Sequence, residues 1–128
     1  MKDFKTKIKI KAEPEDVWMA FTNPNSMELW TGYPAEFTPE PGSEFSLLGG
    51  DIQGKVIEVD PMKKLVEQWY FEGESSESLA TIKFFPQKNS VLVEVTHVNI
   101  PDEAYDNISY GWKNHFLSSI KTFCEVGY

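Results

Sequence analysis

Residues 4–11 alternate between two kinds of side chain. Phe4, Thr6, Ile8 and Ile10 would share one face of an extended chain, and four lysines would share the other. Successive side chains of a strand point to opposite faces of its sheet. The pattern therefore predicts a half-buried strand with a solvated lysine face. We interpret these lysines as protection of a sheet edge against unwanted pairing.

Two short helices are predicted to follow this strand. Pro14 suits the first position of a helix, and Glu15 and Asp16 suit the positive end of the helix dipole. The Asn23–Asn25 segment contains a proline and would end this helix. A second helix is expected at about Ser26–Trp30.

A loop rich in proline, glycine and aromatic residues comes next, over residues 31–42, with a short strand expected around Phe37. Five further segments have the composition of strands and are separated by turn residues. They are Ser43–Leu48, Ile52–Val59, Lys64–Phe71, Ser78–Phe85 and Ser90–Val98. Connections this short favour consecutive antiparallel hairpins, because a parallel crossover needs a dozen or more residues.

The last segment, from Pro101 to about Glu125, has apolar residues at steps of three and four, which predicts one long amphipathic helix. These positions are Tyr105, Ile108, Trp112, Phe116, Ile120 and Phe123. Gly111 in its interior costs about 1 kcal/mol relative to alanine. We interpret it as a close approach, a kink or a tolerated defect. The whole order predicts one α+β domain over residues 1–128, with the helix across the concave face of a curved antiparallel sheet and a pocket between them.

Charge and composition narrow the classes of partner. The 128 residues include 20 acidic and 12 basic side chains, a formal net charge of -8, which disfavours nucleic acids and anionic membranes. The single cysteine, Cys124, excludes an internal disulfide framework and any CxxC metal site. No apolar leader or spanning segment is found, so we expect a cytoplasmic protein. We also expect a monomer or weak homodimer that needs no metal and no cofactor.

Several motifs then carry a resemblance to a known group. Their order along the chain is Pro14 to Phe21, Trp30 with Pro34, Gly42 to Gly54, Glu58-Val59-Asp60-Pro61 through Trp69, Val95-Thr96-His97, and Gly111-Trp112. Together they resemble the START-like superfamily, also called SRPBCC. Within it, the chain is most similar to the activator of heat-shock-protein-90 ATPase homologue-like family.

The resemblance implies a helix-grip fold with a hydrophobic cavity beneath the C-terminal helix. It leaves function open, since relatives include lipid carriers, polyketide cyclases, hormone receptors and co-chaperones. Our leading hypothesis is binding of a small hydrophobic or amphipathic, lipid-like ligand in that cavity. The first alternative is a protein-interaction module of co-chaperone type acting on a chaperone ATPase. The second is a polyketide-cyclase-like enzyme, and we expect binding rather than catalysis.

Two titratable residues are candidates for chemistry. Alternation places Glu67 on one face with Leu65, Trp69 and Phe71, and it places His97 at the end of a valine row. Projecting into one cavity, the two side chains could act as a general acid–base pair. Alternatively, Glu67 faces solvent after a bulge and His97 bonds a backbone group. We expect a structural contact or none between them, because no third group is evident to orient the pair.

Aromatic residues define two further candidate sites. The predicted ligand cavity is lined by Trp69, Phe71, Tyr105, Ile108, Trp112 and Phe116. The predicted pocket mouth or partner surface is formed by Trp30, Tyr33 and Phe37, although core packing of the same loop would explain them equally well. Cys124 is interpreted as a partly packed thiol rather than a nucleophile, because no neighbouring base is evident.

Overall fold

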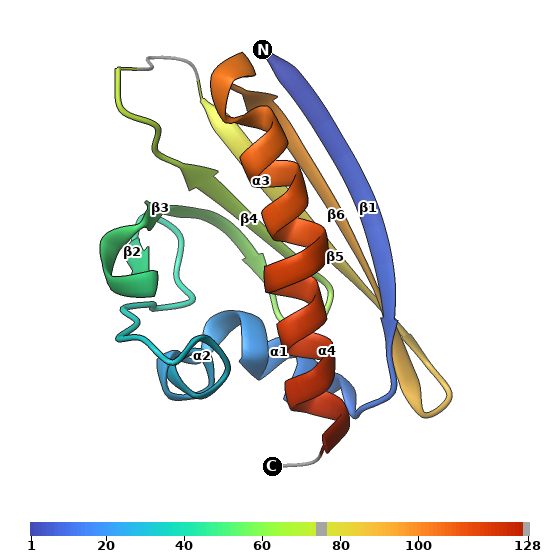
Figure 1. The fold of residues 1–128 in the computed structure, drawn as a ribbon. Coiled ribbons are helices and arrows are strands. Elements are labelled where there is room, and N and C mark those ends of the chain that lie inside the picture. The colour runs from blue at the N-terminus through green and yellow to red at the C-terminus, as the bar shows by residue number, and fades with distance from the viewer. Residues whose placement is uncertain (74–76, 127–128) are drawn as a thin grey trace.

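A computed structural model describes residues 1–73 and 77–126 of the chain. Six strands form one antiparallel sheet, and helices cover a single face of it (Figure 1). The strands are β1 (Lys2–Ile10), β2 (Glu44–Leu47), β3 (Ile52–Asp60), β4 (Lys64–Trp69), β5 (Ser78–Gln87) and β6 (Ser90–Ile100). Their order across the sheet is β1-β6-β5-β4-β3-β2, so β2 to β6 are consecutive hairpin neighbours, as predicted.

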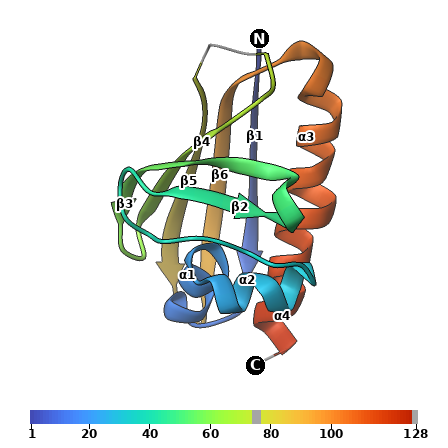
Figure 2. The same ribbon diagram turned by 90° about the vertical axis from the view of Figure 1, so that its left-hand side faces the viewer.

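The curved sheet wraps around the C-terminal helix, and Figure 2 shows the two short helices at the end of the sheet where that helix finishes. These helices are α1 (Pro14–Thr22) and α2 (Pro24–Thr31). Among the described residues, no helix is both long and apolar enough to span a bilayer. The sheet, the two short helices and the long helix form the helix-grip arrangement that the resemblance implied, with one core between sheet and helices.

Asn23 separates α1 from α2 by serving both helices. Its backbone N–H donates to the Met19 carbonyl at 2.8 Å, which closes α1. Its side-chain oxygen accepts from the Ser26 N–H at 3.1 Å, which caps the start of α2. The second helix runs longer at both ends than Ser26–Trp30, because Pro24 fits its first turn and Gly32 ends it with a φ of 78°.

The C-terminal helix is continuous but changes its winding in the middle. It consists of a first turn η2 (Asp102–Ala104), then α3 (Tyr105–Gly111), a π-helical turn η3 (Trp112–Phe116) and α4 (Leu117–Val126). A Cβ added at Gly111 would meet nothing within 4 Å, so the close-approach interpretation of this glycine is wrong. The irregularity lies just after it, in the wider turn that sends Trp112 and Phe116 into the core.

Replacing Gly111 with alanine is expected to stabilise the protein by about 0.5–1 kcal/mol. The residue has ordinary helical angles, φ -60° and ψ -43°, so alanine removes backbone entropy from the unfolded chain without strain. Urea unfolding measures the change. Gly32→Ala is the control and should destabilise, because its φ is 78°. A loss of stability in Gly111→Ala would show that the π-turn depends on glycine.

Several predicted boundaries are corrected by the structure. The strand expected to reach Phe71 ends at Trp69, and Phe71 lies beyond it, half-buried against the core. The short strand expected around Phe37 is a single bridge between Glu36 and Ser46. These differences in strand boundaries occur where the chain leaves the hydrogen-bonded sheet. The point of departure depends on tertiary contacts rather than on the alternation of side chains.

Candidate functional site

Beneath the C-terminal helix, aromatic rings from three elements meet in the core. The Trp69 ring of β4 stacks on the Trp112 ring at 5.2 Å between centroids, and its edge meets the His97 ring of β6 at 4.9 Å. Phe116 packs against Trp112 at 5.0 Å. These four residues, together with Glu67 and Ser78, are called the inner cluster below. All six are buried, with exposed fractions of 0–9%.

The register of the sheet brings Glu67 and His97 to the same inner face. Glu67 is opposite Ala80 on β5, and Ala80 is in turn opposite His97 on β6. The two backbones are therefore two strand spacings apart, roughly 10 Å. The short side chain of Ala80 leaves the space between them to the Trp69 ring, which contacts both residues.

The Glu67 carboxyl is buried with one neutral donor. The indole N–H of Trp69, two residues along on the same face, donates to Oε1 of Glu67 at 3.0 Å. Burial raises the pKa of Glu67 from 4.5 to about 7, against the smaller lowering effect of that hydrogen bond. The carboxyl is therefore largely protonated below neutral pH.

His97 is held by hydrogen bonds that fit only its neutral form. The Trp112 indole N–H donates to Nδ1 at 3.0 Å, so the ring proton is on Nε2. That Nε2–H lies 2.8 Å from Ser78 Oγ and donates to it, while the Ser78 hydroxyl donates to the Val98 carbonyl at 3.2 Å. Burial lowers the pKa of His97 from 6.5 to about 4. Protonation at Nδ1 would set two donors against each other.

This arrangement does not resemble a catalytic pair. A serine next to a histidine suggests a nucleophile and its base, but a base must accept the serine proton through a free ring nitrogen. Here Nε2 already carries a proton, and Nδ1 is occupied by Trp112. Glu67 and His97 bond different tryptophans, and the Trp69 ring contacts both residues. The geometry gives no support to general acid–base chemistry.

The residues predicted to line the cavity are divided by the structure. Trp69, Trp112 and Phe116 belong to the inner cluster, and Phe71 lies at its margin with its ring centroid 6.5 Å from that of His97. Tyr105 and Ile108 are only half-buried, about two turns and one turn before the π-turn, respectively. The side chains that were expected to surround a ligand fill much of the space between sheet and helix themselves.

The residues predicted to form a pocket mouth do not share one surface. Phe37 is buried against Phe45, with ring centroids 5.5 Å apart. Trp30 is half-buried, donates its indole N–H to the Ala20 carbonyl at 2.9 Å, and packs edge-on against Phe116 at 5.0 Å. Tyr33 alone of the three is exposed, at 57%. Core packing, the alternative weighed from the sequence, explains Phe37 and much of Trp30.

An exposed apolar surface lies on the short helices instead. Met19 is 43% exposed and Leu29 is 65% exposed. Two hollows of about 230 and 310 Å³ adjoin there and share Leu29 and Phe123 in their walls. We call the exposed Met19 and Leu29, together with the half-buried Trp30 of α2 and Phe123 of α4, the α2 patch. Sequence analysis missed Met19 and Leu29, because the periodicity of so short a helix does not tell which apolar residues stay outside.

Cys124, the remaining candidate nucleophile, is a packed thiol. Burial, followed by the charges of Asp16 and Glu125, raises the pKa of the Cys124 thiol to about 11. Its Sγ is 3.9 Å from the Asp16 carbonyl, so the thiol is packed and protonated. Within residues 1–73 and 77–126, no group of three histidine, cysteine or acidic side chains is close enough to hold a metal ion.

Comparison with known proteins gives a consistent result. Residues 11–125 match the family model described as activator of Hsp90 ATPase homolog 1-like protein. The chain is 33% identical over 123 residues to an activator of 90 kDa heat shock protein ATPase homolog from Dictyostelium discoideum, covering 94% of this chain and 32% of that protein. The human homolog 1 is 26% identical over 112 residues, covering 84% of this chain and 32% of that protein. The chain thus spans about a third of the length of these curated relatives.

A solved structure agrees with this. The crystal structure of an HSP90 activator from Plasmodium falciparum superposes with a TM-score of 0.87 at 28% identity, covering 94% of each chain. This similarity extends over nearly the whole of both chains.

Proposed function

The chain belongs to the activator of Hsp90 ATPase homolog 1-like family, and from this premise we propose that it binds an Hsp90-type chaperone and raises its ATPase rate. It acts as one domain over residues 1–128, in the cytoplasm, as a monomer or weak homodimer. The observation that carries the proposal is the filled inner cluster, because a domain with its core occupied by its own side chains acts through its surface.

The inner cluster has the features of a packed core rather than of an empty site. Its rings are in contact, and within the described part of the chain every buried side-chain nitrogen and oxygen has a hydrogen-bond partner. A binding site for a polar or reactive ligand usually leaves some such groups free for the ligand. The cluster therefore supports a structural role for Glu67 and His97.

The α2 patch is the surface that we assign to the chaperone. Exposed apolar side chains grouped around hollows are typical of protein contacts, and partner residues insert into such hollows. Leu29 stands between the two hollows and is the most exposed member of the patch. It is therefore the side chain that a partner would bury most.

Binding of a lipid-like ligand stays a prediction, and the geometry does not favour it. A ligand entering between sheet and helix would have to displace Trp112 or Phe116 and break the indole hydrogen bond to His97. A polyketide-cyclase-like activity meets the same obstacle, since its substrate would need that space. Both hypotheses thus require a rearrangement of the core that binding energy would have to offset.

The test is the ATPase rate of the Hsp90-type chaperone from the same organism, measured with increasing amounts of this protein. We expect the rate to rise with the amount of this protein. We expect Leu29→Glu to raise the concentration needed for half-maximal stimulation by about tenfold or more, since a central apolar anchor contributes more than 1 kcal/mol to binding.

Phe85→Glu is the matched control, because Phe85 on β5 is also an exposed apolar side chain, at 44%, but lies outside the patch. It should stimulate like the wild type. Absence of stimulation by the wild-type protein would refute the proposed function. Equal loss in both variants would refute the assignment to the α2 patch.

A further inference from the structure

β1 is one of the two edge strands of the sheet, and two contacts show which of its backbone groups face outward. Lys121 Nζ donates to the Lys9 carbonyl at 2.9 Å, and the Glu125 carboxylate accepts from the Lys11 N–H at 2.9 Å. Along an antiparallel strand, alternate residues direct both backbone groups to the same side. Lys5 and Lys7 therefore also turn their N–H and C=O groups away from β6, in the regular stretch of the ladder.

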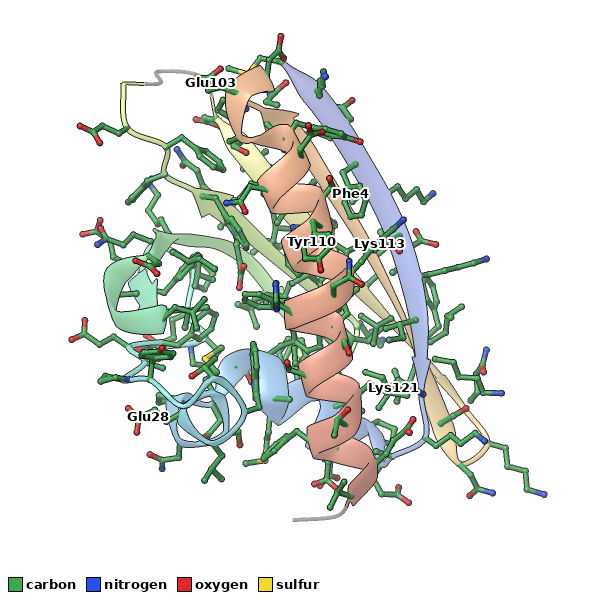
Figure 3. The ribbon with its side chains drawn as sticks, viewed as in Figure 1. Phe4, Glu28, Glu103, Tyr110, Lys113 and Lys121 are labelled. Atoms are coloured by element: carbon green, nitrogen blue, oxygen red, sulfur yellow. The ribbon has the colours of Figure 1, made fainter. Side chains whose placement is uncertain are left out.

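The helix closes part of this edge and leaves the rest open. Lys121 and Glu125 form an ion pair on α4 and occupy the backbone at the end of β1, from the Lys9 carbonyl onward. Figure 3 shows Lys121 beside that end of β1. Phe4 of the strand and Lys113 of the helix lie closer to the other end of β1. The open stretch thus runs from Lys5 to the Lys9 N–H.

Hollows flank the open stretch on both faces of the sheet. On the outer face, a hollow of about 260 Å³ is lined by Lys5, Thr6, Lys7 and Glu94. On the helix side, a groove of about 430 Å³ lies between β1 and the α3–η3 part of the C-terminal helix. Its walls are Phe4, Tyr105, Asp106, Ser109, Tyr110, Lys113 and Asn114. Figure 3 shows Phe4, Tyr110 and Lys113 close together there, and Lys113 Nζ lies 5.8 Å from the Phe4 ring centroid.

We infer that this edge of β1 binds an extended acidic segment of another protein as a seventh strand of the sheet. Backbone groups of Lys5 and Lys7 would pair with the added strand, and its side chains would alternate between the two hollows. Acidic side chains would meet the lysines of the outer face. Apolar side chains would enter the groove along Phe4, Tyr105 and Tyr110.

Charge selects an acidic segment over a second copy of this chain. Antiparallel self-pairing centred on Lys7 would place Lys7 opposite Lys7 and Lys5 opposite Lys9, and like charges directly opposite are destabilising. Lys5 forms one ion pair, with Glu94 at 3.7 Å, and its side chain is 67% exposed. The same lysines that protect the edge against self-association therefore favour an acidic guest.

This inference is independent of the proposed function, because the edge would accept such a strand from any protein. The probe is an end-blocked octapeptide that alternates glutamate and valine, titrated into the ¹⁵N-labelled protein. We expect the amide signals of Lys5 and Lys7 to shift and their hydrogen exchange to slow, with no comparable shifts at the α2 patch.

Variants and peptides separate charge from backbone pairing. Lys7→Ala keeps the outward N–H and should weaken binding about two- to fivefold, the contribution of one opposite-charge cross-strand pair. Lys7→Pro also removes that N–H, at an edge position where proline leaves the pairing with β6 intact, and should lose binding. The same peptide N-methylated at alternate residues keeps its charge and should not bind the wild-type protein.

Three results would overturn the inference. One is the absence of amide shifts in β1 at millimolar peptide, whether or not signals elsewhere in the protein shift. Another is equal binding of an octapeptide that alternates lysine and valine. The third is undiminished binding of the N-methylated peptide, which decides the matter even if Lys7→Pro fails to fold.

Discussion

Replacing Trp112 with alanine is expected to lower the free energy of unfolding by about 4 kcal/mol, within the range for large aromatic residues removed from a core. The Trp112 ring is 2% exposed and touches Trp69, His97 and Phe116, so its loss leaves a cavity at the centre of the inner cluster. It also removes the donor to His97 Nδ1. Urea unfolding measures the change, and the melting temperature should fall by about 10 °C or more.

Trp112→Phe separates the hydrogen bond from the volume. Phenylalanine fills much of the space but leaves Nδ1 of His97 without its donor, which costs about 1–3 kcal/mol for a buried polar atom. The pKa of His97 should also rise, because the free Nδ1 can then accept a proton. If Trp112→Ala changed the free energy of unfolding by less than about 1 kcal/mol, the packed inner cluster would be contradicted. Such a result would favour a cavity that is already present around Trp112.

Stability between pH 4.5 and 6.5 is expected to be governed by two opposing titrations that nearly cancel in the wild-type protein. Glu67 has its pKa raised from 4.5 to about 7, and His97 has its pKa lowered from 6.5 to about 4. Each difference corresponds to about 3 kcal/mol at 1.36 kcal/mol per pH unit. When either group is removed, the free energy of unfolding should change with pH in the way that the other group's titration dictates.

The direction follows from which state holds more protons. Between pH 4.5 and about 7, folded Glu67 keeps a proton that the unfolded chain has lost, so its contribution to stability is present below pH 4.5 and is lost as pH rises to 7. Between about pH 4 and 6.5, unfolded His97 holds a proton that the folded state lacks. Its contribution is therefore present above pH 6.5 and is lost as pH falls to 4.

Glu67→Gln keeps an acceptor for the Trp69 indole and removes the contribution to stability that is lost as pH rises. Relative to the wild type, it should become more stable by about 3 kcal/mol as pH rises from 4.5 to 7. His97→Asn should show the opposite trend, losing stability relative to the wild type as pH rises from 4 to 6.5. Urea unfolding across this range gives both differences. A difference that does not vary with pH would mean that the residue does not titrate in the core.

The order of elements and the family resemblance predicted the fold. Alternation placed Glu67 and His97 on faces with apolar residues but left open whether both point inward, as the structure has them. Period two and short turns specify antiparallel hairpins, and the steps of three and four specify the long helix. The pairing of Ser78 with His97 could not be predicted, because it depends on the register of β5 against β6. The role of Trp112 as donor to Nδ1 depends in turn on the π-turn, for which Gly111 was only an ambiguous signal.

The aromatic loop shows a second limit of sequence analysis. Trp30, Tyr33 and Phe37 have similar composition around them, yet Tyr33 is exposed, Trp30 is half-buried and Phe37 is buried. Which ring enters the core is decided by Phe45 and Phe116, which are distant in sequence. A cavity was predicted from a stripe of aromatic residues facing an aromatic strand. The same stripe equally describes rings that pack on one another, and here Trp69, Trp112 and Phe116 are in mutual contact.

The central claim is that the space beneath the helix is occupied by the protein's own side chains, so the domain acts through its surface. Its most direct test is ¹H–¹⁵N NMR of the indole N–H groups of Trp69 and Trp112 during titration with decanoate below its micelle concentration and, separately, with the Hsp90-type chaperone. We predict that decanoate leaves both indole signals unchanged, and that the chaperone perturbs amides of α2 while both indoles stay hydrogen-bonded. Saturable shifts of the two indole signals with decanoate would contradict the claim and restore ligand binding as the function.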